Sequence, residues 1–286
     1  MSQETENPPD LRPLPLPRPE HFRYEERARV GVITLSRPDR FNALTFAAYR
    51  ELTDLFHVID RRSLAPEGAR ALVLQGEGRA FCSGGDVEDI IKYLFDRDAE
   101  GLVRFTRMTG ELIAAMRRCK LPIVASVKRV AAGAGAVMAL ASDLRVMGAG
   151  SFFAFLFPQV GLSGADMGAS YLLPRLVGLG HASDILLTGD RVPAARCLQI
   201  GLANRVVADE PDRDNVDREA FALAESLAQK PHFATRMTKT MLQRELDMGF
   251  DDAIEAEAQA QAICMLHPDF REASAARDEE RAPRWR

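Results

Sequence analysis

The chain of 286 residues has few of the features that mark specialised classes of protein. Its four cysteines are scattered without the spacing of a metal site or a disulfide framework, which indicates reduced thiols. No apolar run is as long as a membrane span, and the N-terminus has no apolar signal segment. The net charge is only −4 with mixed signs. We therefore expect a cytoplasmic protein with neither a membrane nor a nucleic acid as partner.

Hydrophobic residues make up 47% of the chain, which is enough for the core of one large domain. Residues 1–21 are rich in proline, and we expect a disordered tail there. Residues 22–210 alternate between strand and helix patterns, whereas residues 211–286 have helical patterns only. This alternation favours an α/β fold with parallel strand pairing.

Helical periodicity predicts amphipathic helices over 43–59, 101–118 and 219–229, and one long helix over 234–262. The apolar side of the first helix contains Leu44, Tyr49, Leu52, Leu55, Phe56 and Ile59. The apolar side of the last stretch contains Met241, Leu242, Leu246, Ile254 and Ile263.

Two predicted junctions between a strand and a helix consist almost entirely of small residues. An apolar strand pattern at 71–74 is followed by Ala-Phe-Cys-Ser-Gly-Gly-Asp at 80–86. A second strand pattern at 121–127 is followed by Ala-Ala-Gly-Ala-Gly-Ala at 131–136. Two such junctions can direct two backbone N–H groups at one oxygen atom, which forms an oxyanion hole without side chains. We interpret Cys82 in the first junction as a small buried residue and not as a nucleophile.

The order of these motifs resembles the crotonase superfamily, also called the enoyl-CoA hydratase/isomerase family. The resemblance covers the segments 36–44, 81–86, 132–135, 158–178 and 187–206. It implies a ββα spiral core over 22–210, and a C-terminal helical region over 211–286 that forms homotrimers or dimers of trimers. It also implies an acyl-CoA substrate and no tightly bound cofactor, because coenzyme A is part of the substrate.

The resemblance assigns roles to individual residues. The N–H groups of Gly85 and Ala134 would hold the thioester oxygen. A second group would contact coenzyme A, with Lys239 as a candidate for its phosphates: Arg37, Asn42, Ala43, Leu44, Phe81, Ser83, Gly84 and Lys239. Arg40 and Lys92 are further candidates for the phosphates, and Asp86 is expected to cap the helix that follows it.

The acid and base groups depart from the family pattern. Typical hydratases of the family use two glutamates, and the matching positions here are Val137 and Gln159. Neither side chain can act as a base. Asp166 matches the single aspartate that serves as base in some enoyl-CoA isomerases of the family. Its alternative role is to cap a helix over 167–173.

The sequence leaves four functional hypotheses open. Isomerisation of a double bond with Asp166 as the single base is the first, because one base can remove and return the same proton. The second is hydration of an enoyl-CoA by non-standard carboxylates. The third is hydrolysis of the thioesterase or dehalogenase type, and the fourth is an inactive acyl-CoA binding protein. No cluster of residues has the spacing of metal ligands.

Overall fold

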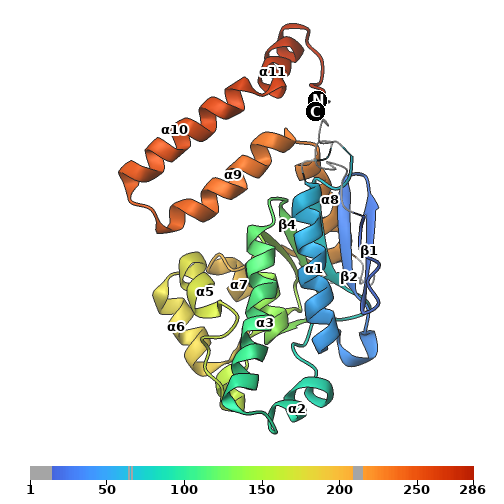
Figure 1. The fold of residues 1–286 in the computed structure, drawn as a ribbon, viewed down its shortest axis with the longest axis vertical. Helices are drawn as coiled ribbons and strands as arrows, with labels where there is room; N and C mark the ends of the chain where they lie inside the picture. The colour runs from blue at the N-terminus through green and yellow to red at the C-terminus, as the bar shows by residue number, and fades with distance from the viewer. Residues whose placement is uncertain (1–14, 64, 66, 209–214) are drawn as a thin grey trace, which may run out of the picture.

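The computed structural model describes residues 15–63, 65, 67–208 and 215–286. Most of the predicted tail and the predicted boundary at 210–211 therefore lie outside the described residues. A six-stranded sheet runs in the order β1-β2-β3-β4-β6-β9, and a second sheet in the order β5-β7-β8 (Figure 1). The strands are β1 (Phe22–Arg27), β2 (Val30–Leu35), β3 (Ala71–Gly76), β4 (Ile123–Val127), β5 (Val130–Ala132), β6 (Leu144–Gly148), β7 (Phe152–Ala154), β8 (Arg191–Pro193) and β9 (Arg205–Val207).

The helices alternate with the strands as far as β9 and then follow one another to the C-terminus. They are α1 (Phe46–Arg62), α2 (Lys92–Leu94), α3 (Ala99–Arg118), α4 (Ala134–Ala141), α5 (Ala169–Val177), α6 (Leu179–Thr188), α7 (Ala194–Gln199), α8 (Asn215–Ala228), α9 (His232–Arg244), α10 (Phe250–Leu266) and α11 (Pro268–Asp278). Strands β2, β3, β4, β6 and β9 are paired in parallel, and β1 joins β2 antiparallel. The predicted α/β class with parallel pairing is confirmed.

Successive side chains of the central strands enter two different hydrophobic clusters, one on each face of the sheet. The face toward α8 carries Val30, Val32, Ala71, Val73, Val124 and Val146. The opposite face carries Ile33, Leu35, Leu72, Leu74, Ile123 and Ala125, which pack with side chains of α1, α3 and α4. Because both faces are covered by helices, the strands read as continuous apolar runs in the sequence.

Helices α3 and α8 begin two and four residues earlier than predicted, and two further differences have a clear local cause. Helix α1 begins at Phe46 and not at residue 43, because Thr45 is its N-cap and accepts a hydrogen bond from the N–H of Ala48 (3.2 Å). The helix predicted over 234–262 is two helices, α9 and α10. A 3₁₀ turn at Glu245–Asp247 and the extended residue Gly249 separate them.

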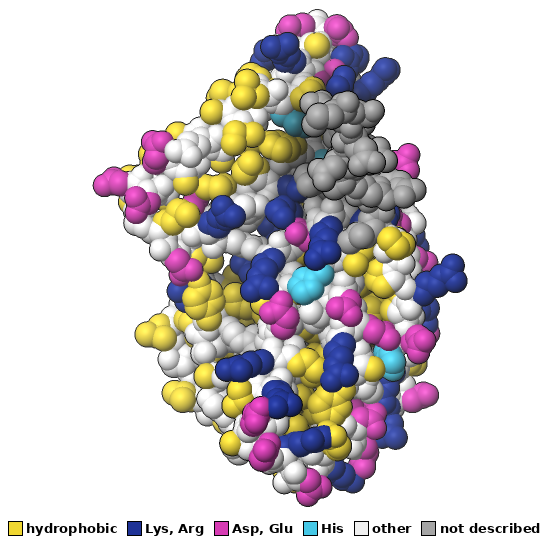
Figure 2. Space-filling model, viewed as in Figure 1, with side chains coloured by type: hydrophobic (Ala, Val, Ile, Leu, Met, Phe, Trp, Pro, Cys, Tyr) yellow, Lys and Arg dark blue, Asp and Glu magenta, His cyan; other side chains and the backbone are white. Residues whose placement is uncertain are grey.

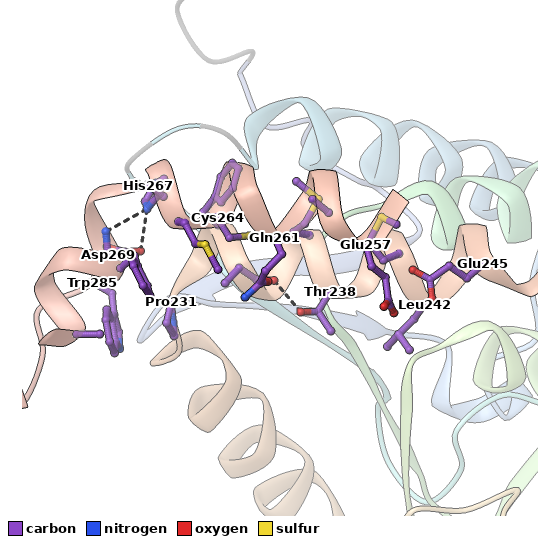
Figure 3. Close-up of a pocket in the computed structure, with 18 residues that line it drawn as sticks. Pro231, Thr238, Leu242, Glu245, Glu257, Gln261, Cys264, His267, Asp269 and Trp285 are labelled. Carbon is purple, nitrogen blue, oxygen red and sulfur yellow. Dashed lines mark hydrogen bonds and ion pairs between the residues drawn. The ribbon is translucent and has the colours of Figure 1, made fainter. Parts of the chain in front are cut away.

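Helices α9, α10 and α11 project away from the sheet (Figure 1). Figure 2 shows hydrophobic side chains gathered over this projecting part. A groove of about 550 Å³ runs between the helices, and Figure 3 shows Leu242, Cys264 and Trp285 among its lining residues. Large apolar side chains here are exposed, namely Leu242, Leu246, Phe250, Ile254, Ile263, Met265, Leu266 and Phe270. In a single chain, the predicted apolar side of this region therefore remains partly uncovered. Among the helices of the described ranges, none has the length and apolar character needed to cross a membrane.

Candidate active site

The two junctions of small residues meet where β3 and β4 end. Strands β3 and β4 are parallel neighbours, so their carboxyl ends lie at the same edge of the sheet. An isolated bridge joins Cys82 to Ala131. In it, the N–H of Cys82 donates to the carbonyl of Val130 (3.1 Å), and the N–H of Ala132 donates to the carbonyl of Cys82 (2.9 Å). The backbone of one junction is thus hydrogen-bonded to the backbone of the other.

Glycine is required at this contact. A Cβ atom at Gly135 would lie 2.4 Å from the carbonyl oxygen of Cys82, which is far inside van der Waals contact. Gly84 has a φ of +106°, and a Cβ atom there would lie 3.1 Å from the carbonyl oxygen of Ala132. Cys82 itself is fully buried, and burial raises the pKa of its thiol to about 12. The interpretation of Cys82 as a small buried residue is confirmed.

The N–H groups of Gly85 and Ala134 are left without an acceptor among the described residues. Leu44 forms hydrogen bonds to the residues on both sides of Gly85. Its N–H donates to the carbonyl of Gly84 (2.8 Å), and its carbonyl accepts from the N–H of Asp86 (2.9 Å). The N–H of Gly85 lies between these two bonds and points away from Leu44. Ala134 is the first residue of α4, so its N–H has no acceptor within the helix. A Cβ atom at Gly84 would lie only 3.5 Å from the nitrogen of Ala134, which places the two donors in neighbouring backbone segments.

Asp86 holds the first junction in place. Its side chain accepts from the N–H groups of Glu88 (2.9 Å) and Asp89 (3.2 Å), which confirms the predicted helix cap. It also forms an ion pair with Arg37 (3.0 Å). Burial acts to raise the pKa of Asp86, but these hydrogen bonds and the guanidinium of Arg37 outweigh it and hold the pKa below its usual value. Arg37 also donates to the carbonyl of Ala43 (2.8 Å), so its guanidinium fixes the loop.

Asp166 lies in the loop before α5 and is half buried. One of its oxygens accepts from the N–H of Met167 (2.9 Å). Helix α5 begins at Ala169 with Gly168 as its N-cap and no side-chain cap, so the alternative that Asp166 caps a helix over 167–173 is wrong. Burial raises the pKa of Asp166, although the N–H of Met167 acts in the opposite direction. A carboxylate with a raised pKa is a stronger base than an ordinary aspartate.

The positions of the two missing glutamates hold structural side chains. Val137 is fully buried in α4. The amide of Gln159 donates to the carbonyl of Gly189 (2.9 Å). Of the three positions 137, 159 and 166, only the last therefore offers a carboxylate. Near the first junction, Glu88 forms an ion pair with Lys92 (2.6 Å). The ammonium of Lys92, a candidate for the phosphates, therefore already has a carboxylate partner.

Apart from Lys239, the residues predicted to contact coenzyme A lie in or beside the first junction, and several of their side chains already form hydrogen bonds within the protein. Asn42 donates to the carbonyls of Ala80 (2.9 Å) and Glu77 (3.0 Å) and accepts from the N–H of Arg37 (3.0 Å). Ala43, Leu44, Phe81 and Gly84 are buried, and the hydroxyl of Ser83 donates to the carbonyl of Arg40 (3.3 Å). What this segment can offer a ligand is mainly its backbone.

The structure contradicts the prediction for Lys239. Its side chain is only 8% exposed, and its ammonium forms an ion pair with Asp143 (2.7 Å) and donates to the carbonyl of Leu121 (2.7 Å). An enclosed and paired ammonium cannot reach the phosphates of coenzyme A. The sequence analysis also missed Arg79 and Arg129, whose guanidinium groups lie 4.6 Å and 6.0 Å from the ring centre of Phe41 beside the first junction. No local sequence signal distinguishes these two arginines from the other surface cations.

Two free backbone donors at adjoining strand-to-helix junctions can stabilise an oxyanion. Comparison with known proteins identifies the family and the fold. The family model described as enoyl-CoA hydratase/isomerase matches residues 25–286. A Mycobacterium leprae protein named probable enoyl-CoA hydratase echA12 is 34% identical over 280 residues, which cover 95% of this chain and 88% of the relative.

Two further comparisons extend this result. A 1,2-epoxyphenylacetyl-CoA isomerase of Escherichia coli is 28% identical, and the match covers 90% of this chain and 94% of the relative. A solved structure from Streptomyces coelicolor A3(2), provisionally named an enoyl-CoA hydratase, is 46% identical with a TM-score of 0.90 and covers 100% of this chain and 99% of that one. The chain belongs to the enoyl-CoA hydratase/isomerase family and is an enzyme of that family with the crotonase fold.

Substituting Gly135 tests the contact between the junctions. We expect Gly135→Ala to lower the free energy of unfolding by about 2–3 kcal/mol, because the added methyl group overlaps the carbonyl of Cys82 and the backbone must move. Gly180→Ala is the matched control, since a Cβ atom there would meet nothing within 4 Å and alanine favours the helix. Urea denaturation measures both variants. Equal midpoints for Gly135→Ala and the unmodified protein would show that the two backbones are not in close contact.

Proposed function

We propose that the enzyme moves a carbon–carbon double bond in an acyl-CoA thioester, with Asp166 as its single base. The observation that carries the proposal is the combination of two backbone N–H groups without acceptors, at Gly85 and Ala134, with one half-buried carboxylate. A single base suffices for this reaction, because the proton that it removes from one carbon is returned to another.

The proposed steps balance without any further reactant. The carboxylate of Asp166 removes a proton from the α-carbon of a 3-enoyl thioester, and the electron pair of that bond shifts toward the carbonyl. The thioester oxygen becomes an enolate oxygen and accepts from the N–H groups of Gly85 and Ala134. The protonated Asp166 then delivers its proton to the γ-carbon, which leaves the double bond between the α- and β-carbons.

Each backbone donor would supply a large share of the barrier reduction. Loss of one oxyanion-hole donor typically costs on the order of 3–4 kcal/mol of transition-state stabilisation. Neither donor would need to reorient during the reaction, because the bridge to Leu44 fixes Gly85 and the helix start fixes Ala134. Met167 and Phe157 are buried apolar residues close to Asp166 in the sequence, and in our proposal their side chains help to keep water from the enolate.

The substrate class follows from the same site. In our proposal, coenzyme A lies along the segments 42–44 and 81–84, where backbone groups contact the pantetheine, and exposed cations such as Arg40 contact the phosphates. The names of the relatives support a coenzyme A thioester, since they include both enoyl-CoA hydratases and an isomerase of 1,2-epoxyphenylacetyl-CoA. Hydration remains the second candidate because several relatives carry that name.

The C-terminal helices serve, in our proposal, to join copies of the chain into a homotrimer or a dimer of trimers. The exposed apolar side chains of α9 and α10 support this, because burying them stabilises the projecting helices. Sedimentation velocity is the direct test. We expect a mass three or six times the 31.6 kDa of one chain. Sedimentation as a single chain at micromolar concentration would contradict the proposal.

Replacing Asp166 tests the base. We expect Asp166→Asn to reduce conversion of 3-hexenoyl-CoA to 2-hexenoyl-CoA by about 10²–10⁴-fold, because the amide cannot accept the proton. Asp184→Asn, which alters an exposed carboxylate on α6, is the matched control and should keep full activity. NMR in heavy water measures both conversion and deuterium incorporation.

The pH dependence of the unmodified enzyme adds a second readout. Since the base must be ionised, activity should fall as the pH drops through the pKa of Asp166, which burial places above that of an ordinary aspartate. Full activity of Asp166→Asn would exclude this residue as the base. Formation of a 3-hydroxyacyl-CoA would instead support hydration, and release of free coenzyme A would support hydrolysis. Binding without any turnover would favour an inactive acyl-CoA binding protein.

A further inference from the structure

Tyr49 has a hydroxyl group that the fold leaves unused. It lies on α1, one turn after the N-cap Thr45, and its side chain is 2% exposed within the main hydrophobic cluster. Its hydroxyl forms no hydrogen bond with any described residue. By contrast, the hydroxyls of Tyr24 and Tyr171 donate to Glu26 (2.7 Å) and Asp247 (2.6 Å). The sequence alone placed Tyr49 only on the apolar side of its helix.

The hydroxyl of Tyr49 lies beside the proposed oxyanion hole. It is 3.9 Å from the position that a Cβ atom at Gly85 would take. Standard geometry separates such a Cβ from the nitrogen of its own residue by about 2.5 Å, so the hydroxyl lies within roughly 6.5 Å of the Gly85 donor. If the thioester oxygen accepts from the N–H of Gly85, the hydroxyl of Tyr49 can reach acyl atoms next to that oxygen.

The charge environment agrees with this location. Burial is the main cause that raises the pKa of Tyr49, and the carboxylate of Asp166 acts in the same direction, so the hydroxyl stays protonated and able to donate. Tyr49 and Asp166 are therefore near enough to interact electrostatically, yet no hydrogen bond joins them.

A polar group in an apolar site costs free energy unless it finds a hydrogen-bond partner. The thioester oxygen already has two donors in the proposed mechanism, at Gly85 and Ala134. A third donor close to Gly85 is suited to an acceptor located elsewhere on the acyl group. A site that offers such a donor discriminates against analogues that lack the acceptor, because the donor is then left unpaired.

We propose that Tyr49 determines substrate specificity by donating a hydrogen bond to an oxygen atom that the acyl group carries close to the thioester, such as a hydroxyl or oxo group. This inference rests on the proposed acyl-CoA function. The enzyme would accordingly prefer oxygen-bearing acyl groups over plain hydrocarbon chains of the same length.

Equilibrium binding of two thioesters tests the inference without requiring turnover. Isothermal titration calorimetry compares 3-hydroxybutyryl-CoA with butyryl-CoA, which differ by one oxygen atom. We expect the unmodified enzyme to bind the hydroxylated thioester about tenfold more tightly. Tyr49→Phe removes only the hydroxyl. The variant should bind the two thioesters with about equal affinity, and its affinity for butyryl-CoA should change little.

Tyr24→Phe is the matched control, because it removes a hydroxyl that is bonded to Glu26 on β1, and it should keep the tenfold preference. Equal affinities of the unmodified enzyme for the two thioesters overturn the inference, whatever the variants do. A preference that survives in Tyr49→Phe also overturns it. In both cases the thioesters bind, so the acyl-CoA function stands. Absence of binding by either thioester overturns the acyl-CoA function and the inference together.

Discussion

The contact between two stretches of backbone at the ends of β3 and β4 is the constraint on which the rest of the site depends. Gly135 leaves room for the carbonyl of Cys82, where a Cβ atom would lie 2.4 Å away. This contact turns α4 so that its first N–H group, at Ala134, adjoins Gly84. Two backbone donors from separate parts of the chain thereby come close together.

Several polar side chains maintain this arrangement, and their hydrogen-bonding groups are already paired within the protein. Asn42 donates to the carbonyls of Glu77 and Ala80, just after β3, and Arg37 and Asp86 form an ion pair that fixes the first junction. These residues match the family motifs, yet their side chains bond mainly to the protein. In the proposed mechanism, the chemistry is therefore carried by backbone N–H groups and by the carboxylate of Asp166. A site built from backbone donors can in principle keep those donors while its acid and base side chains change. Our proposal interprets Val137 and Gln159 as such a change.

The elements that were predictable from the sequence are those set by local pattern. The strand runs, the small residues of the two junctions and the capping role of Asp86 follow from composition and spacing over a few residues, and the structure confirms them. Lys239 could not be placed in this way, because its partner Asp143 is distant in the sequence and only the packing of α9 brings them together. The break between α9 and α10 was missed because the residues around it keep a helical pattern. Tyr49 was assigned to the core correctly, but periodicity does not reveal whether a buried hydroxyl has a partner.

A crystal structure of the enzyme with a non-reactive acyl-CoA analogue tests the central claim most directly. If the two junctions form the oxyanion hole, the thioester oxygen will lie about 2.7–3.1 Å from the nitrogens of both Gly85 and Ala134. An analogue bound with its thioester oxygen in contact with neither nitrogen would contradict the account.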